Sequence, residues 1–314
     1  MSNRSKKNNH CFITIDLDPV YHYVRSRGWK LKSGSNYNIV YDDAINRYQK
    51  IFNHFGIKAT FFVVGEDLLN SRNIGVVKEL HEDQHEIANH TMNHLQSFEM
   101  LNFKKKNYQI MKSHEKIHEA IGHEPKGFRA PGWNIDQKTI NILKDNNYLY
   151  DTSILPSYFN FPLKIYNKIL NWNNNFPIFG KSLRIPFGKR APYRTLSKDY
   201  LKAGSNGIWE LPVSTTPTTR FPLLGAMLFK LGIDNFKRLL PKPDRMPYFN
   251  IVLHGLDLVD KNLVNDDRLI IKPGYALSIE EKENTITQLI SILSKDYQFS
   301  TMTNYICNHP ENDI

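Results

Sequence analysis

The sequence predicts an α/β fold in which parallel strands alternate with helices that lie outside the sheet. Two observations predict it. Short apolar runs alternate with longer amphipathic stretches, and the side chains that could carry chemistry follow the ends of the apolar runs. A strand followed by a helix, repeated along the chain, is typical of a parallel sheet. No internal repeat and no clear linker divides the 314 residues, so we expect one barrel-like domain spanning 1–314.

The expected elements follow one another in short order. Strands are expected where the apolar runs are, and helices where apolar and polar residues alternate with helical spacing. Residues 134–136 carry a helix-start signal, and Ser278 with Glu281 forms a capping box. The strands are 12–16, 59–64, 86–89, 127–129, 148–151, 248–254 and 297–301, and the helices are 41–55, 74–81, 103–121, 136–145 and 278–294.

Two stretches break this rhythm. Five prolines interrupt an aromatic, basic segment between residues 155 and 207, which we interpret as loops and short helices over one face. A second irregular piece lies between Pro212 and Pro247. We therefore expect a core of about 11–155 and 208–303, with basic insertions at about 156–207 and 213–247.

Composition and charge exclude several classes of protein. With 40% hydrophobic and 23% charged residues the chain is globular, not disordered or fibrous. The net charge of +10 is concentrated: residues 158–202 carry nine Lys/Arg and one acidic residue, and residues 220–245 carry six and two. A local excess of this kind indicates a partner surface. The two cysteines, Cys11 and Cys307, form no disulfide framework, so we expect a reducing compartment.

The apolar runs are too short for membrane insertion. The longest, 221–229, has nine residues, whereas a spanning helix needs about 20. The run at 11–15 is too short for the core of a secretion signal, so we expect a cytoplasmic protein. Residues 221–240 nevertheless combine apolar side chains with nearby cations, which suits either a membrane interface or a helix pair packed on the barrel.

Paired carboxylates and histidines at strand ends are the first chemical signals. Asp16 and Asp18 are spaced by one residue at the end of the first strand, so they point to the same face. His90 and His94 have the spacing at which two imidazoles on one helix face bind one metal. Together, Asp18, His90 and His94 would make a two-histidine, one-carboxylate set with room for water. Either pair alone is weak evidence.

Three further motifs follow later strands, and their order carries more information than any one of them. They are Phe128-Arg129-Ala130-Pro131, Tyr150-Asp151-Thr152-Ser153 and Val252-Leu253-His254. The whole series from Phe12 to His254 resembles the polysaccharide deacetylases of the NodB homology family, carbohydrate esterase family four. All five motifs of that family are recognisable in order.

The resemblance implies a deformed (β/α) barrel and a metal-dependent hydrolase that removes an N-acyl group from an amino sugar. By this resemblance Asp16 is the general base and Asp18, His90 and His94 are the metal ligands. Arg129 positions Asp16, His254 is the general acid, and Asp151 orients His254. Pro131 and Trp133 are expected at the substrate, and a backbone N–H near Gly132 or Trp133 would hold the oxyanion.

The motifs depart from the usual family pattern in two places. Leu17 separates the two aspartates, as in a side branch of the family, so the roles of Asp16 and Asp18 are open to exchange. Thr152-Ser153 replaces the usual aromatic residue, and Trp133 either supplies that apolar wall or belongs to the core. The side branch also includes hydrolases of formamides and of small cyclic amides. Zinc is the expected ion, and cobalt, nickel, manganese and iron also suit this ligand set.

These features together predict the substrate class. A sugar N-deacylase without a secretion signal and with a basic, apolar surface resembles the branch acting on polyprenyl-phosphate-linked amino sugars in lipopolysaccharide or lipid A modification. We expect it at the cytoplasmic face of the inner membrane. The alternatives are a soluble amidase or deformylase of a small or cyclic amide, and an inactive glycan- or nucleic-acid-binding protein. No nucleic-acid fold signature is present, so no nucleic-acid partner is expected, and the oligomeric state is not predicted.

Overall fold

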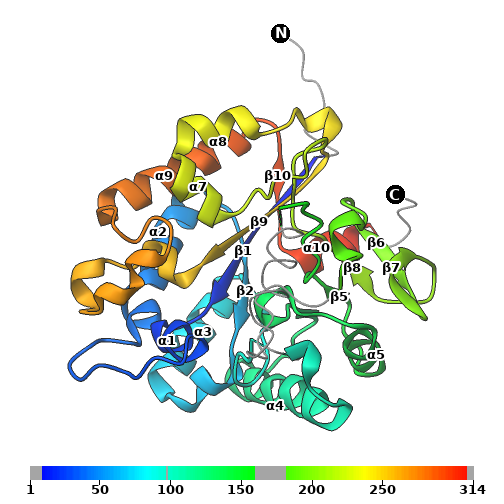
Figure 1. The fold of residues 1–314 in the computed structure, drawn as a ribbon, viewed down its shortest axis with the longest axis horizontal. Helices are drawn as coiled ribbons and strands as arrows, with labels where there is room; N and C mark the ends of the chain where they lie inside the picture. Colours follow the sequence, from blue (N-terminus) through cyan, green and yellow to red (C-terminus); the bar gives the residue numbers. More distant parts are fainter. Residues whose placement is uncertain (1–8, 97, 160–181, 310–314) are drawn as a thin grey trace. The chain divides into compact units, whose positions relative to one another are not determined.

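The computed structural model describes residues 9–96, 98–159 and 182–309. By its internal contacts the chain divides into two compact units. Unit 1 comprises Met1–Thr60 and Leu223–Thr301, and unit 2 comprises Phe61–Pro222 and Met302–Ile314 (Figure 1). Strands alternate with helices in both units, as predicted. The single-domain boundaries stay a prediction.

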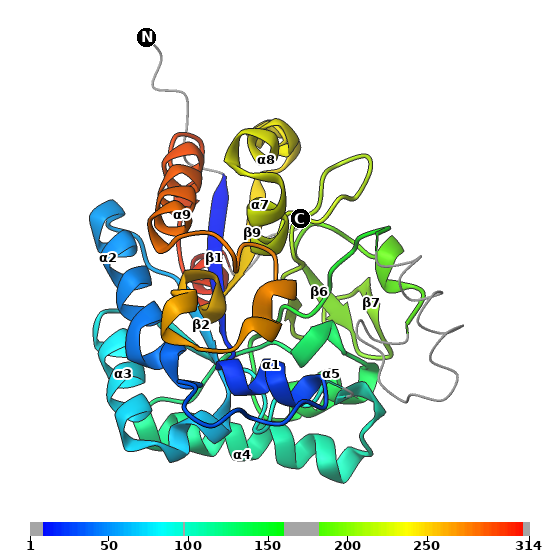
Figure 2. The ribbon, with the colours of Figure 1, turned by 60° about the vertical axis from the view of Figure 1, so that its left-hand side comes forward.

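Unit 1 is built on three parallel strands. The central strand β1 (His10–Leu17) is buried over nearly its whole length and pairs with β9 (Tyr248–His254) on one side and β10 (Gln298–Phe299) on the other. Helix α9 (Ile279–Leu293) begins at the predicted capping box, in which Ser278 and Glu281 exchange hydrogen bonds. In Figure 2, α9 lies between α2 (Ile45–Phe55) and α8 (Ile233–Leu239), and it contacts both.

The part of the irregular piece at 213–247 that belongs to unit 1, from Leu223 onward, contains a helix pair. Helix α7 (Gly225–Leu231) packs against β9, where a Cβ at Gly225 would lie 2.7 Å from Leu253 Cδ2, and α8 packs on α9. The side chains of Leu223, Leu228 and Phe236 are fully buried. Of the two alternatives for residues 221–240, packing on the fold is therefore what the structure has. The other elements of unit 1 are α1 (Val20–Ser26), η2 (Val40–Ala44), η7 (Pro243–Arg245), η8 (Gly255–Leu258), η9 (Lys261–Leu263) and η10 (Asp267–Ile271).

Unit 2 contains the strands from β2 to β8, the helices between them and helix α10. Its strand order is β2-β3-β4-β5-β8-β6-β7, in which β3, β4, β5 and β8 are parallel. Helix α4 contacts both α3 and α5. The elements are β2 (Thr60–Val63), η3 (Gly65–Leu69), α3 (Ser71–Glu82), β3 (Glu86–Asn89), η4 (Phe98–Met100), α4 (Phe103–Ile121), β4 (Gly127–Phe128), η5 (Pro131–Trp133), α5 (Gln137–Asp145), β5 (Tyr150–Asp151), η6 (Ile185–Phe187), β6 (Tyr193–Leu196), β7 (Asp199–Ala203), β8 (Trp209–Glu210) and α10 (Met302–Asn308).

The described part of the insertion expected at 156–207 contains loops and the short helix η6, as predicted, but also two strands that were not predicted. Its described part adds the antiparallel hairpin β6–β7 to the sheet beside β8. The reason is a period of two that the prolines obscure, since Tyr193 and Thr195 are buried and Arg194 is exposed. Three aromatic residues counted in this segment, Trp172, Phe176 and Phe179, lie outside the described residues.

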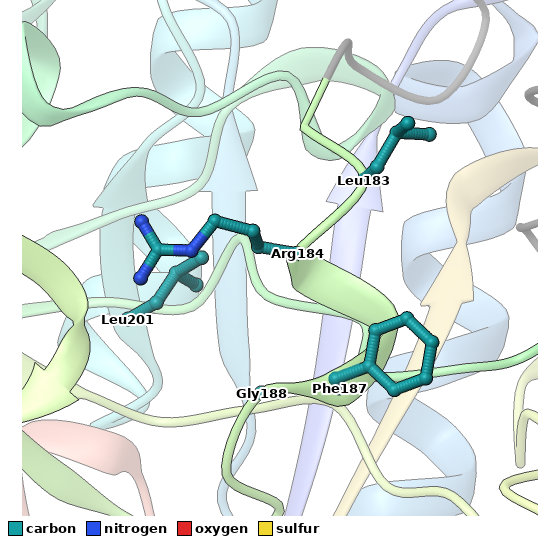
Figure 3. Close-up of a pocket in the computed structure, with 5 residues that line it drawn as sticks. All are labelled: Leu183, Arg184, Phe187, Gly188 and Leu201. Carbon is teal, nitrogen blue, oxygen red and sulfur yellow. The ribbon is translucent and has the colours of Figure 1, made fainter.

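A cavity lies beside this hairpin. It has a volume of about 480 Å³ and is lined by Leu183, Arg184, Phe187, Gly188 and Leu201 (Figure 3). Within the described ranges no helix has the length and apolar character needed to cross a membrane.

Candidate active site and metal centre

Unit 1 places the predicted base beside the predicted acid. Asp16 is the last residue but one of β1, and Asp18 follows the strand; both are 4% exposed. In the parallel register of β1 and β9, Asp16 lies opposite His254. The Nε2 atom of His254 is 4.0 Å from an Asp16 carboxylate oxygen. The carboxyl ends of these two strands therefore bring a carboxylate and an imidazole together.

Two residues that the sequence analysis missed surround His254. Asp257 accepts a 2.8 Å hydrogen bond from the His254 backbone N–H, and its carboxylate is 4.0 Å from His254 Nδ1. Lys272 lies 3.2 Å from the other Asp257 oxygen. Burial lowers the pKa of His254 and the charge of Lys272 lowers it further, while Asp257 and Asp16 raise it. The signal for Asp257 was its position three residues after His254, where a carboxylate caps a turn.

His90 follows β3 in unit 2, and one hydrogen bond fixes its tautomer. Its Nδ1 lies 2.7 Å from the backbone carbonyl of Arg129. Because a carbonyl oxygen only accepts, Nδ1 carries the proton and Nε2 presents a lone pair. A backbone carbonyl on the far nitrogen is the usual outer partner of a metal-binding histidine.

The segment that carries His94 is a loop, so the predicted helical spacing of the two histidines is wrong. Thr91 and His94 have φ angles of 69° and 50°, in the left-handed region that a helix excludes. The loop is fixed by hydrogen bonds from Thr91 N–H to Asn89 Oδ1 and from His94 N–H to Thr91 Oγ1. The two imidazole rings still lie 4.9 Å apart, centre to centre. A turn brings them together in place of a helix face.

Arg129 is fully buried at the end of β4. Its guanidinium donates to the Thr152 carbonyl, with a nitrogen–oxygen distance of 3.2 Å, and lies 4.1 Å from the centre of the Phe62 ring. A cation over an aromatic face in a buried site is held in one orientation. The arginine is thus rigid, as a positioning residue must be.

Asp151 forms a buried pair with Glu210, which the sequence analysis also missed. The two residues are opposite each other on β5 and β8, and both are 0% exposed. Asp151 accepts hydrogen bonds from the Ser153 N–H and hydroxyl. Burial raises the pKa of both carboxyl groups, and that of Glu210 rises well above its usual range. At Asp151 this rise is opposed by hydrogen bonds from Glu210 and Ser153 and by the charge of Arg129. The signal for Glu210 was a lone acid within the apolar run around Trp209.

Pro131 and Trp133 form the short turn η5. Pro131 is buried and Trp133 is partly exposed, while Gly132 and Trp133 both have positive φ angles, of 60° and 55°. The Trp133 N–H donates to the Ala130 carbonyl. The turn itself therefore uses one of the two backbone groups predicted to hold the oxyanion.

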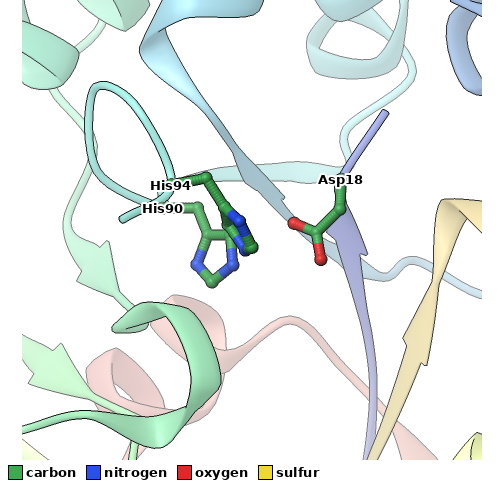
Figure 4. Close-up of side chains that lie close together, drawn as sticks. All are labelled: Asp18, His90 and His94. Carbon is green, nitrogen blue, oxygen red and sulfur yellow. The ribbon is translucent and has the colours of Figure 1, made fainter. Parts of the chain in front are cut away.

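The donor side chains predicted to hold the metal ion are Asp18, which follows β1 in unit 1, and His90 and His94, which lie in unit 2. Figure 4 shows these side chains with the strand end and the loop that carry them. Two imidazoles and one carboxylate suit zinc and the other divalent transition metals.

Comparison with known proteins identifies a matching family. The polysaccharide deacetylase model matches residues 33–150, which include His90, His94 and Arg129. A peptidoglycan-N-acetylglucosamine deacetylase of Bacillus cereus is 34% identical over 98 residues, covering 31% of this chain and 44% of that protein. The uncharacterized protein YlxY of Bacillus subtilis is 35% identical over 86 residues, covering 27% of this chain and 26% of YlxY. The matched segments thus span less than half of either relative.

The fold also matches a solved structure over nearly its whole length. A Mycobacterium smegmatis protein assigned to the polysaccharide deacetylases has a TM-score of 0.63 and 17% identity, covering 98% of this chain and 92% of that one. The predicted resemblance is therefore confirmed: residues 33–150 match the polysaccharide deacetylase model, and the chain has the deformed (β/α) barrel fold that the resemblance implies.

Proposed function

We propose that this protein is a metal-dependent N-deacetylase of an amino sugar carried on a polyprenyl phosphate. The observation that carries the proposal is the register of β1 and β9, which sets Asp16 opposite His254 with 4.0 Å between their side chains. Hydrolysis of an amide needs a base for the attacking water and an acid for the departing amine. A carboxylate and an imidazole at one strand end can supply both.

Asp18, His90 and His94 are the residues that would hold the metal. Their donor types fit a divalent transition metal. The hydrogen bond from His90 Nδ1 to the Arg129 carbonyl puts the lone pair of this imidazole on Nε2, the atom that would bind the metal. A bound ion would polarise the acyl carbonyl and make water more acidic. Zinc is proposed because the reaction needs no redox chemistry.

The remaining steps belong to residues of the chain. Asp16 would take a proton from the water whose oxygen bonds to the acyl carbon. His254 would give a proton to the nitrogen as the carbon–nitrogen bond breaks, releasing acetate and a free amine. Arg129 and Asp151 are proposed to position Asp16 and His254. A backbone N–H at Gly132 would hold the developing oxyanion, a contribution of about 3 kcal/mol.

The proposal of a lipid-linked substrate is supported by the side chains on the surface of unit 2. Phe159 and Phe187 are more than half exposed in a segment that carries an excess of cations. Aromatic faces contact sugar rings, and arginines bind phosphate. Such a substrate belongs to lipopolysaccharide, lipid A or other envelope glycan modification, at the cytoplasmic face of the inner membrane. Apolar side chains of residues 221–240 such as Leu223, Leu228 and Phe236 are buried, so the basic segment is the support proposed for a membrane contact.

Mass spectrometry of a polyprenyl-phosphate N-acetylhexosamine incubated with zinc-loaded protein tests the proposal. We expect loss of one acetyl group with the wild type and with Asp234→Asn, an exposed control, and no loss with Asp16→Asn. Reaction on a soluble N-acetylated oligosaccharide alone would refute the lipid carrier. Reaction on formyl or cyclic amides alone would establish the amidase alternative. No reaction on any of these substrates would refute the proposed deacetylase and favour the inactive binder.

A further inference from the structure

Arg220 is held in one position on the surface of unit 2. One of its guanidinium nitrogens donates to the carbonyls of Pro186 and Gly188, at 2.8 and 2.7 Å. Its guanidinium carbon lies 5.2 Å from the centre of the Tyr158 ring. Its backbone has a φ angle of 50°, which a non-glycine residue rarely adopts. The side chain is therefore ordered before any ligand arrives.

Arg190 stands two residues after Gly188, whose carbonyl accepts a 2.7 Å hydrogen bond from Arg220, so a second positive charge lies near that of Arg220. Both arginines are partly buried. Burial lowers the pKa of Arg190, and the charge of Arg220 lowers it further. Two guanidinium groups that repel each other in a partly buried site cost free energy unless a negative charge lies between them.

No carboxylate of the described residues compensates this pair. Neither arginine forms a hydrogen bond or an ion pair with an Asp or Glu in those ranges, and Asp199 of the neighbouring hairpin is bound to Arg184 at 2.7 Å. Residues 160–181 contain no Asp or Glu in their sequence. An anionic group bound at this place would lower the electrostatic cost of the two positive charges.

Exposed aromatic rings border the arginine pair. Tyr158 and Phe187 are 40% and 62% exposed, and their ring centres are 5.5 Å apart. Phe187 and Gly188 also line the 480 Å³ cavity of Figure 3, and the Gly188 carbonyl accepts a hydrogen bond from Arg220, so the cavity adjoins this arginine. Aromatic side chains left in water beside cations are typical of a surface that binds a group with one apolar and one anionic part.

We propose that Arg190 and Arg220 bind a phosphate group of the substrate, while Tyr158 and Phe187 contact the sugar or chain attached to that phosphate. The site rests on the proposed function, because the lipid-linked amino sugar supplies the phosphate. Arginine suits this role, since its planar fork donates two hydrogen bonds to one phosphate.

Equilibrium binding to the full-length protein tests the site without any need for turnover. The three probes are N-acetylglucosamine, N-acetylglucosamine 1-phosphate and farnesyl-phosphate-linked N-acetylglucosamine, each titrated calorimetrically. The variants are Arg190→Gln and, as a control with the same change in net charge, Lys198→Gln, which alters an exposed lysine of the β6–β7 turn. Arg220→Lys keeps the charge of Arg220 and removes its fork.

We expect Arg190→Gln to weaken both phosphorylated probes about tenfold or more and to leave the neutral sugar unchanged, as expected for loss of a charge-assisted hydrogen bond. Lys198→Gln should weaken them less than about twofold. If the soluble and the lipid-linked phosphates bind with equal affinity, the site recognises the phosphate alone. Tighter binding of the lipid-linked probe would support contacts of Tyr158 and Phe187 with the attached chain.

Equal effects of Arg190→Gln and Lys198→Gln would overturn the site. The two proposals fail separately. Binding that depends on Arg190 without deacetylation would refute the proposed function and keep the phosphate site. If Arg190→Gln changes neither deacetylation nor the KM for the phosphorylated substrate, the phosphate site is refuted and the proposed function is kept.

Discussion

The carboxyl groups of Asp151 and Glu210 face each other on paired positions of β5 and β8, with no exposure to solvent. Arg129 is the nearby positive charge, and it is also fully buried. One arginine balances one carboxylate. The pair is therefore most stable with a single negative charge, when Glu210 keeps its proton and donates it in a hydrogen bond to Asp151.

This pair predicts a pH-dependent stability that Glu210→Gln removes. In the unfolded chain Glu210 loses its proton near pH 4.3, its ordinary pKa. In the folded protein burial raises that pKa, so over the window above about pH 4.3 the unfolded state has released a proton that the folded state keeps. Stability from this group then falls as pH rises, by about 1.4 kcal/mol for each pH unit over which the folded carboxyl keeps a proton that the unfolded one has lost.

Urea unfolding between about pH 4 and pH 8 measures the effect. Glutamine keeps a donor toward Asp151 and cannot ionise, so the variant should gain stability over the wild type as pH rises. Asp199→Asn is the control. The hydrogen bond from Arg184 lowers the pKa of Asp199, so this carboxylate is ionised in both the folded and the unfolded protein above about pH 4, and the difference from the wild type should stay constant over this range. A Glu210→Gln difference that stays constant with pH would contradict the shared proton.

Lys272→Met should shift the pH dependence of turnover upward. His254 must hold a proton to act as the acid, so a lower pKa removes activity at lower pH. Lys272 lowers that pKa, and it also pairs with Asp257, whose charge raises it. Loss of Lys272 removes a positive charge near His254. It also leaves the negative charge of Asp257 without its lysine partner, and both changes favour the protonated imidazole. We expect the alkaline limb of the kcat profile to move to higher pH. At a pH where the wild-type kcat has already fallen, the kcat of the variant should be several-fold higher than that of the wild type.

The measurement is a pH profile of kcat for Lys272→Met beside Lys261→Met. Lys261 is exposed and contacts the Ala276 carbonyl, so its loss should leave the limb in place. An unchanged limb in Lys272→Met would show that another group titrates.

The sequence predicted the strands and helices of the repeating part well, because each is defined by local periodicity. The structure has β3 at Glu86–Asn89, α4 at Phe103–Ile121 and β9 at Tyr248–His254, as expected. Periodicity failed where side chains act through tertiary contacts. The β6–β7 hairpin was hidden by flanking prolines, and the His90–His94 turn depends on hydrogen bonds to Asn89 and Thr91.

The site could be predicted only as far as its motifs reach. Asp16 and His254 were identified from their places in the motif series, and the register of β1 and β9 joins them. Glu210 and Asp257 were missed because single acids carry no pattern. Their meaning comes from what they face, a buried aspartate for Glu210 and a histidine backbone for Asp257.

His94→Ala should remove most of the bound metal. Loss of an outer partner of a ligand already costs about 10–100-fold in metal affinity, so loss of a ligand should cost at least as much. His118→Ala is the matched control, since His118 is exposed on α4. Metal content after dialysis and competition with a chelator measure the difference. Chelation should abolish deacetylation and added zinc should restore it; equal zinc retention by both variants would exclude His94 as a ligand.

Gly127→Ala should destabilise the fold next to Asp151. A Cβ at Gly127 would lie 2.1 Å from the Tyr150 ring, closer than any real contact, and that ring belongs to the residue before Asp151 on β5. The Tyr150 hydroxyl is held by Glu86 at 2.8 Å, which limits how far the ring can move. Overpacking of this kind costs about 1–3 kcal/mol, and we expect kcat to fall with it.

Gly75→Ala provides the matched comparison in the same unit. Gly75 lies inside α3, and a Cβ there meets nothing within 4 Å. Alanine in a helix interior should stabilise the protein by about 0.5–1 kcal/mol relative to glycine. Chemical denaturation of the two variants should then give free energies of unfolding that move in opposite directions. If both substitutions raised the stability, the contact between β4 and the Tyr150 ring would not be as close as the structure places it, and Asp151 would lose that support.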